Sequence, residues 1–172
     1  MRLKLLTGMS QGDLLRLQPK RDLRAHGIHV QRHKTKRKSG KRTIYVWDDT
    51  HDPETGEMVP GPLRRAVDMA LAARTAEQSE FLFCNRYGEG YYDEENGEAR
   101  GWKSMWQRFM ARVLKETKVQ QSFTEHDLRA KVASDAETLE HARALLAHAD
   151  ARTTHRVYRR RPERVKAAQQ CA

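Results

Sequence analysis

The sequence predicts an α+β fold that is mainly helical, with one small antiparallel β-hairpin or sheet. Three observations support this prediction. Several segments carry apolar residues at intervals of three and four, which is the spacing of one face of an α-helix. Two short segments, 28–31 and 43–47, show the pattern of a half-buried strand. The length of 172 residues suits one domain with its own hydrophobic core.

The first half of the chain is expected to hold two short helices and the hairpin. Residues 1–9 look like the tail of a helix that breaks at Gly8, and residues 11–17 form the next helix. A polar turn over 36–41 joins the two predicted strands and gives the hairpin a strongly basic tip. Residues 48–61 are acidic and rich in Pro and Gly, so a loop is expected there.

The second half is expected to be helical. Apolar spacing, a Thr124 N-cap and an arginine-rich final segment predict helices over 63–74, 102–118, 125–136, 137–147 and 153–168. Between the first two of these, residues 81–83 form a short buried strand or turn. Residues 87–101 form a polar loop that contains glycine.

The charge balance points to a polyanionic partner. Lys and Arg number 33 against 23 Asp and Glu, a net charge of +10, which favours nucleic acid, although a merely basic soluble protein is an alternative. No apolar stretch approaches the roughly 20 residues of a membrane span. Cys84 and Cys171 lack metal-type spacing, so a reduced, cytoplasmic protein is expected.

Four polar residues near the C-terminus suggest phosphodiester chemistry. His126 and Arg129 are three residues apart, so they share one helix face and can meet one phosphate. His148 follows at a helix end, and Tyr158 stands ten residues later. Taken singly, each has an ordinary explanation: a surface pair, a C-cap histidine and a core aromatic. Only their order and separation make the set specific.

In order and separation these motifs closely resemble the C-terminal signature of the tyrosine recombinases, the phage-integrase-type site-specific recombinases. The segments that carry this resemblance are 123–129, 145–154 and 157–160. Residues 7–15 look like the family block T-G-x-R-x-x-E/D-L, and His33-Lys34-Thr35 looks like its β-hairpin K-T motif. The resemblance runs from Leu3 to about Val165.

The resemblance implies a role for each of these residues. Tyr158 would attack the scissile phosphate and form a 3′-phosphotyrosyl bond. Arg129 would bind the phosphate, His126 and His148 would donate hydrogen bonds or move protons, and Lys34 would protonate the 5′-oxygen leaving group. Further lysines and arginines in the hairpin leave the choice of the general acid open.

The resemblance also implies the setting of the reaction. Residues 1–172 would form a single tyrosine-recombinase catalytic domain, with an incomplete first helix and no N-terminal core-binding domain. The function would be DNA integration or site-specific recombination on double-stranded DNA, with other integrase protomers in a tetramer and no membrane. No cofactor or metal ion is expected, because side chains supply the positive charge.

The sequence departs from the family pattern at the first catalytic arginine, where this chain has Ser10. Asp13 keeps the acidic position that supports that arginine, Gln11 is uncharged, and Arg16 lies nearly two turns further along. One stabilising donor is worth on the order of 10²–10³ in rate, so weak or absent cleavage is expected. Ala147 also replaces the usual glycine before His148.

Three alternatives therefore stay open. In the first, the chain is a catalytically inactive, DNA-binding remnant of a prophage or mobile-element integrase. In the second, it is a basic RNA-binding protein and not an enzyme. The RNA-binding alternative lacks an aromatic platform for bases. The third alternative is a metal site whose ligands are His126, His141, His148 and His155.

Overall fold

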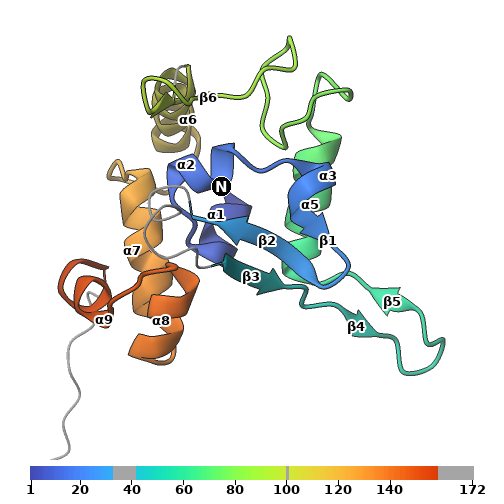
Figure 1. The fold of residues 1–172 in the computed structure, drawn as a ribbon. Coiled ribbons are helices and arrows are strands. Elements are labelled where there is room, and N and C mark those ends of the chain that lie inside the picture. Colours follow the sequence, from blue (N-terminus) through green and yellow to red (C-terminus); the bar gives the residue numbers. More distant parts are fainter. Residues whose placement is uncertain (33–41, 100, 159–172) are drawn as a thin grey trace, which may run out of the picture.

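The computed structural model describes residues 1–32, 42–99 and 101–158 (Figure 1). The elements are, in order, α1 (Arg2–Thr7), α2 (Gln11–Leu15), α3 (Pro19–Asp22), β1 (Leu23–Arg24), β2 (Gly27–Gln31), β3 (Arg42–Val46), β4 (Thr50–His51), β5 (Met58–Val59), α5 (Pro62–Ala72), β6 (Tyr92–Asp93), β7 (Glu98–Ala99), α6 (Trp102–Glu116), α7 (Glu125–Asp135), α8 (Leu139–Leu145), α9 (Ala151–Thr153) and the π-helix η2 (Thr154–Tyr158). The predicted class is confirmed: the described chain is mainly helical with small antiparallel sheets.

The predicted hairpin is the centre of a three-stranded sheet in the order β1-β2-β3. Strands β2 and β3 pair antiparallel, with His29 opposite Ile44. Gly27 has a φ of 151°, and a Cβ there would lie 2.2 Å from the Tyr45 carbonyl oxygen, so only glycine allows this approach. Strand β1 was not predicted. The predicted basic tip over 36–41 lies outside the described residues.

Both predicted polar loops contain a small two-stranded ribbon. Strands β4 and β5 pair within 48–61, and β6 and β7 pair within 87–101. The turns are held by aspartates: the Asp52 carboxylate accepts from the backbone N–H groups of residues 54 and 55, and Asp93 does the same for residues 95 and 96. Figure 1 shows the β4–β5 ribbon extending away from the rest of the chain.

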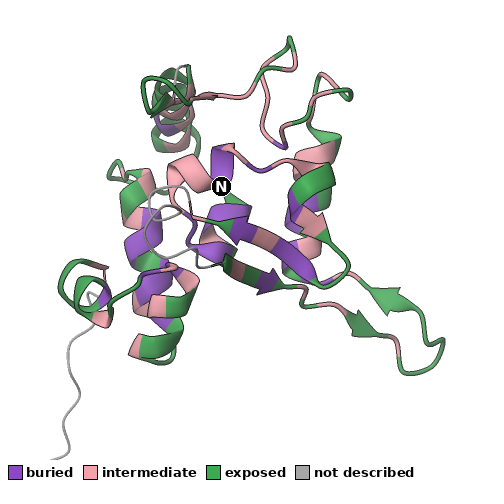
Figure 2. Cartoon of the chain, viewed as in Figure 1, coloured by how far each residue is buried: buried purple, intermediate pink, exposed green. Residues whose placement is uncertain are grey.

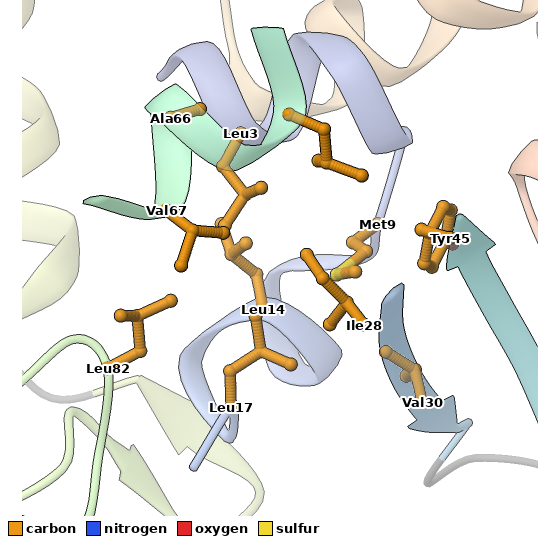
Figure 3. Close-up of a cluster of buried hydrophobic side chains, with 11 residues drawn as sticks. Leu3, Met9, Leu14, Leu17, Ile28, Val30, Tyr45, Ala66, Val67 and Leu82 are labelled. Carbon is orange, nitrogen blue, oxygen red and sulfur yellow. The ribbon is translucent and has the colours of Figure 1, made fainter. Parts of the chain in front are cut away.

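The main hydrophobic core lies between α1, α2, the sheet and α5. Figure 3 shows Leu3 of α1, Leu14 of α2, Ile28 of β2 and Val67 of α5 converging there. Leu82 joins this core, and its backbone N–H donates to the Leu17 carbonyl at 2.7 Å. The segment 81–83 is therefore a bend, which agrees with the predicted turn and not with the predicted strand.

A second, smaller core joins α7 and α8. It is built from Ala133, Ala136, Ala142 and Leu146, with Tyr158 packed against it. Helix α1 is tied to α7 by an ion pair between Lys4 Nζ and Glu125 Oε1, 2.9 Å apart, whose side chains are only 4% and 13% exposed. The C-terminal helices are thereby fixed to the first elements of the chain, and Figure 2 shows buried residues on both.

Helix α6 forms where the sequence predicts a helix, and much of its apolar face is exposed. Met110 is the buried residue on it, while Met105 and Leu114 are 37% and 40% exposed. The final helix, expected over 153–168, is described only to Tyr158, as α9 followed by η2. Within the described residues, no helix combines the length and apolarity needed to cross a membrane.

Candidate active site

Helix α7 begins where the sequence predicts and positions the first two candidate residues. The Thr124 hydroxyl accepts from the Asp127 backbone N–H, and the Asp127 carboxylate accepts from the Thr124 backbone N–H, which together form a capping box. This cap fixes the start of the helix. His126 and Arg129 therefore lie one turn apart on the side that faces α8 and η2.

Arg129 is buried, at 5% exposure, yet its contacts are carbonyl groups and an imidazole rather than a carboxylate. Its guanidinium donates to the Gly8 carbonyl, to the Leu146 carbonyl at 2.6 Å and to His148 Nε2 at 3.1 Å. None of the ion pairs found among the described residues involves Arg129. Among the described residues its charge is held by uncharged groups, which suits an anion-binding group.

The pKa of Arg129 reflects this setting. Burial and the nearby Arg32 guanidinium lower it from its ordinary value, whereas the hydroxyls of Tyr158 and Tyr45 raise it. An arginine stays protonated at neutral pH in spite of such a shift, because its ordinary pKa is so high. Arg129 is therefore a permanent buried cation beside a tyrosine hydroxyl.

His148 is held by a reversed turn at the end of α8. Ala147 has a φ of 50°, the left-handed conformation that normally favours glycine, and the His148 N–H bonds back to the Arg143 carbonyl at 3.0 Å. The turn is therefore reversed although alanine stands in place of the usual glycine, and His148 is buried at 5% exposure.

The protonation of His148 follows from its partners. An arginine can only donate, so His148 Nε2 accepts from Arg129, and Nδ1 carries the hydrogen that it donates to Thr154 Oγ1 at 2.8 Å. Burial, Arg129 and Arg32 lower the pKa of His148 to about 4. The ring is therefore neutral at pH 7, and its protonation is unfavourable because the imidazolium would be buried beside two arginines.

Tyr158 meets these residues from the same chain. Its ring centroid lies 4.8 Å from that of His126 and 5.0 Å from that of His148. The Arg129 guanidinium carbon lies 5.4 Å from the same centroid. The structure thus brings together four of the five candidate residues. Lys34, the fifth, lies outside the described residues, and its role stays a prediction.

Ser10 is a helix cap in this structure. Its hydroxyl accepts from the Asp13 N–H at 3.3 Å, which starts α2, and donates to Asp13 Oδ2 at 2.6 Å. Arg16, which the sequence raised as a substitute for the missing arginine, is engaged elsewhere. It makes two contacts with Glu94, at 2.6 and 2.9 Å, and lies 3.8 Å from the Tyr92 ring centroid.

Arg32 is the site residue that sequence reasoning missed. It follows β2 directly, its Nε lies 3.9 Å from Asp13 Oδ2, and its Nη1 donates to the Ala147 carbonyl at 3.2 Å. In the sequence it is one of many cations between residues 32 and 42, and nothing in that run distinguishes it. The sequence marked Arg32 only by its position, one residue after the predicted strand 28–31.

The four-histidine metal site is not formed. His141 and His155 are exposed on α8 and η2, whereas His148 is buried. Across residues 1–32, 42–99 and 101–158, no three His, Cys, Asp or Glu side chains are grouped so that they could hold a metal ion. The spacing of seven residues would align these histidines only on one continuous helix, and the reversed turn at Ala147 separates them.

Two solved structures share this fold. The XerA recombinase superposes with a TM-score of 0.58 at 20% sequence identity, over 93% of this chain and 52% of that one. The Tn1549 transposon integrase, solved in complex with circular intermediate DNA, gives a TM-score of 0.54 at 16% identity, over 93% of this chain and 54% of that one. No protein-family model matches the sequence, and no curated protein matches it.

This chain spans about half the length of each of these two proteins. One is a recombinase and the other is a transposon integrase. The identities are low, so the likeness is one of architecture. The chain has the tyrosine-recombinase fold.

Proposed function

We propose that residues 1–172 form the catalytic domain of a site-specific DNA recombinase or integrase that acts through a 3′-phosphotyrosyl intermediate. One observation carries the proposal: Arg129, His126 and His148 surround Tyr158, with a buried guanidinium at the tyrosine ring. When a nucleophile attacks a phosphodiester, negative charge builds up on the phosphate oxygens. A rigid cation beside the nucleophile stabilises that charge.

In the proposed reaction, the Tyr158 oxygen attacks the phosphorus and the bond from phosphorus to the 5′-oxygen breaks. One phosphodiester replaces another, so the bond energy is kept for rejoining. A free phenol has a pKa near 10, so its proton has to be drawn away at neutral pH. The flanking His126 ring serves that step, His148 holds the Arg129 guanidinium through Nε2, and Arg129 binds the non-bridging oxygens. Lys34 protonates the leaving oxygen.

The partner in this proposal is double-stranded DNA. The net charge of +10 provides a sequence-independent attraction to phosphates. The Tn1549 integrase that shares the fold was solved with DNA. Assembly with further integrase protomers on DNA, a cytoplasmic location and an origin in a prophage or mobile element belong to the same proposal.

A second function is favoured by Ser10. A serine in place of the first catalytic arginine would leave DNA binding intact while it removes turnover, so the chain would act as an inactive, DNA-binding remnant. Both proposals predict salt-sensitive binding to duplex DNA. They differ in whether a covalent bond forms.

Nicked suicide duplexes with randomised sequence separate the two proposals. An enzyme forms an adduct that survives denaturation, and Tyr158→Phe abolishes it. Tyr87→Phe is the matched control, because Tyr87 is exposed and far from α7 in the sequence. Duplex binding without any adduct at high protein concentration would support the remnant and contradict the enzyme.

A further inference from the structure

We propose that Arg32 takes over the phosphate contact that the arginine missing at Ser10 would have made. The proposal deepens the function given above and rests on it. It makes Arg32 and Arg129 a pair of guanidinium groups on one phosphodiester. The two are far apart in the sequence, because Arg32 directly follows the central strand β2 and Arg129 lies on α7.

The turn after α8 holds the two arginines side by side. Three successive carbonyls at the end of this helix accept hydrogen bonds from outside it. The Leu145 carbonyl accepts from the Tyr45 hydroxyl at 2.9 Å, that of Leu146 from Arg129 at 2.6 Å, and that of Ala147 from Arg32 at 3.2 Å. Arg32 and Arg129 thus bind neighbouring carbonyls. His148 is the next residue in the chain.

Asp13 connects Arg32 to the position that Ser10 occupies. The same carboxylate oxygen, Oδ2, lies 2.6 Å from the Ser10 hydroxyl and 3.9 Å from Arg32 Nε. An acidic side chain at this position supports the first arginine in the pattern that the sequence resembles. Here that carboxylate is approached by an arginine from β2 instead of one from α2.

The exposure of Arg32 suits contact with a ligand. Its side chain is 18% exposed and that of Asp13 is 8% exposed, so the pair is largely shielded while part of the Arg32 side chain stays accessible. At 3.9 Å, Arg32 Nε is beyond hydrogen-bond distance of Asp13 Oδ2. The carboxylate therefore orients the cation by charge.

The local charge points to an anion. Arg32 and Arg129 bind neighbouring carbonyls, so two permanent cations share a mostly buried site. Burial and then Arg32 lower the pKa of Arg129, and burial, Arg129 and Arg32 lower that of His148. Like charges held together away from water are unfavourable. A phosphodiester that accepts from both guanidinium groups would remove this repulsion. Arg16 offers no such arrangement, because it already pairs with Glu94.

The competing explanation is structural: Arg32 would only bind an unpaired carbonyl at the helix end. Orthovanadate, a small mimic of transferring phosphate, separates the two explanations. Its affinity for the full chain is measured by calorimetry for Arg32→Gln and, as the matched control, for Arg16→Gln. Glutamine keeps a donor for the Ala147 carbonyl but loses the charge. The temperature midpoint of unfolding is recorded for each variant.

If Arg32 contacts the phosphate, Arg32→Gln weakens vanadate binding about tenfold or more, and Arg16→Gln changes it less than about twofold. The double variant Ser10→Arg with Arg32→Gln recovers most of the loss, because Asp13 then orients an arginine from α2. Unchanged binding in Arg32→Gln, or no vanadate binding by the parent chain, overturns the proposal. A double variant as weak as Arg32→Gln overturns the equivalence of the two positions.

These measurements do not depend on nucleophilic attack. Tyr158→Phe should bind vanadate with little change, because both arginines remain. If the suicide duplex gives no adduct while Arg32→Gln loses vanadate affinity, the assignment of Arg32 stands and the proposed strand cleavage fails.

Discussion

Replacing Ala147 by glycine should stabilise the protein, although glycine usually destabilises a fold. Ala147 has a φ of 50°, and the left-handed conformation costs an L-residue with a Cβ about 1–2 kcal/mol. Glycine removes that cost but gives the unfolded chain more freedom, worth about 0.4–1 kcal/mol. The difference is a gain of about 0.5–1 kcal/mol in the free energy of unfolding.

Urea denaturation of the parent and of Ala147→Gly measures this difference. Ala144→Gly is the matched control, because Ala144 is exposed within α8 and its φ is helical. That control should lose about 1 kcal/mol. For a domain of this size, the gain in Ala147→Gly corresponds to a rise in Tm of about 1–4 °C. If Ala147→Gly destabilises the protein as much as Ala144→Gly, the reversed turn before His148 is wrong.

Three further predictions concern stability. The pKa of His148 is about 4 in the folded chain against 6.5 in the unfolded chain, so the neutral ring contributes at most about 3 kcal/mol to the free energy of unfolding above pH 6.5. This contribution is lost as the pH falls towards 4. NMR titration should give a pKa of about 4, and a value near 6.5 would refute the buried contact with Arg129. Glu125→Gln leaves the Lys4 charge buried without its partner and should lower the free energy of unfolding, measured by urea denaturation, by about 3–5 kcal/mol. The double variant Glu125→Gln with Lys4→Met should lose less, because no charge stays buried. Equal losses in the two variants would show that the pair is solvated. Thr124→Ala removes the cap of α7 and should cost about 1 kcal/mol by the same measurement, while no loss would contradict the capping box.

The long helices and the hairpin were predictable because their patterns extend over several residues. Apolar spacing located α5 and α6 within two residues at either end, and Thr124 marked the start of α7 correctly. Strands β4 to β7 have two residues each, too few for an alternation to show. Their turns carried the better signal, since Asp52 and Asp93 bind the backbone after them.

Helix α6 shows what periodicity leaves out. An apolar stripe tells which residues share a face, but it does not tell what covers that face. Trp106 and Phe109 are only partly buried, and Met105 is exposed. The prediction of the helix was confirmed, but the apolar stripe alone did not determine how deeply that face is buried.

The candidate site divides in the same way. Residues on α7 and around α8 were found because a short motif fixes their spacing along the chain. Arg32 was missed because its role depends on the contacts that the end of β2 makes with Asp13 and with the Ala147 carbonyl, which are distant from it in the sequence. Ser10 was correctly seen as a departure, but its role as the cap of α2 required the structure.

The central claim is that Tyr158 is the nucleophile of a phosphodiester exchange, and peptide mass spectrometry of the suicide-duplex adduct tests it most directly. We expect a nucleotide joined through a 3′-phosphate to the peptide that contains Tyr158, and no such peptide from Tyr158→Phe. An adduct on another residue, or no adduct from a folded chain that binds the duplex, would contradict the claim.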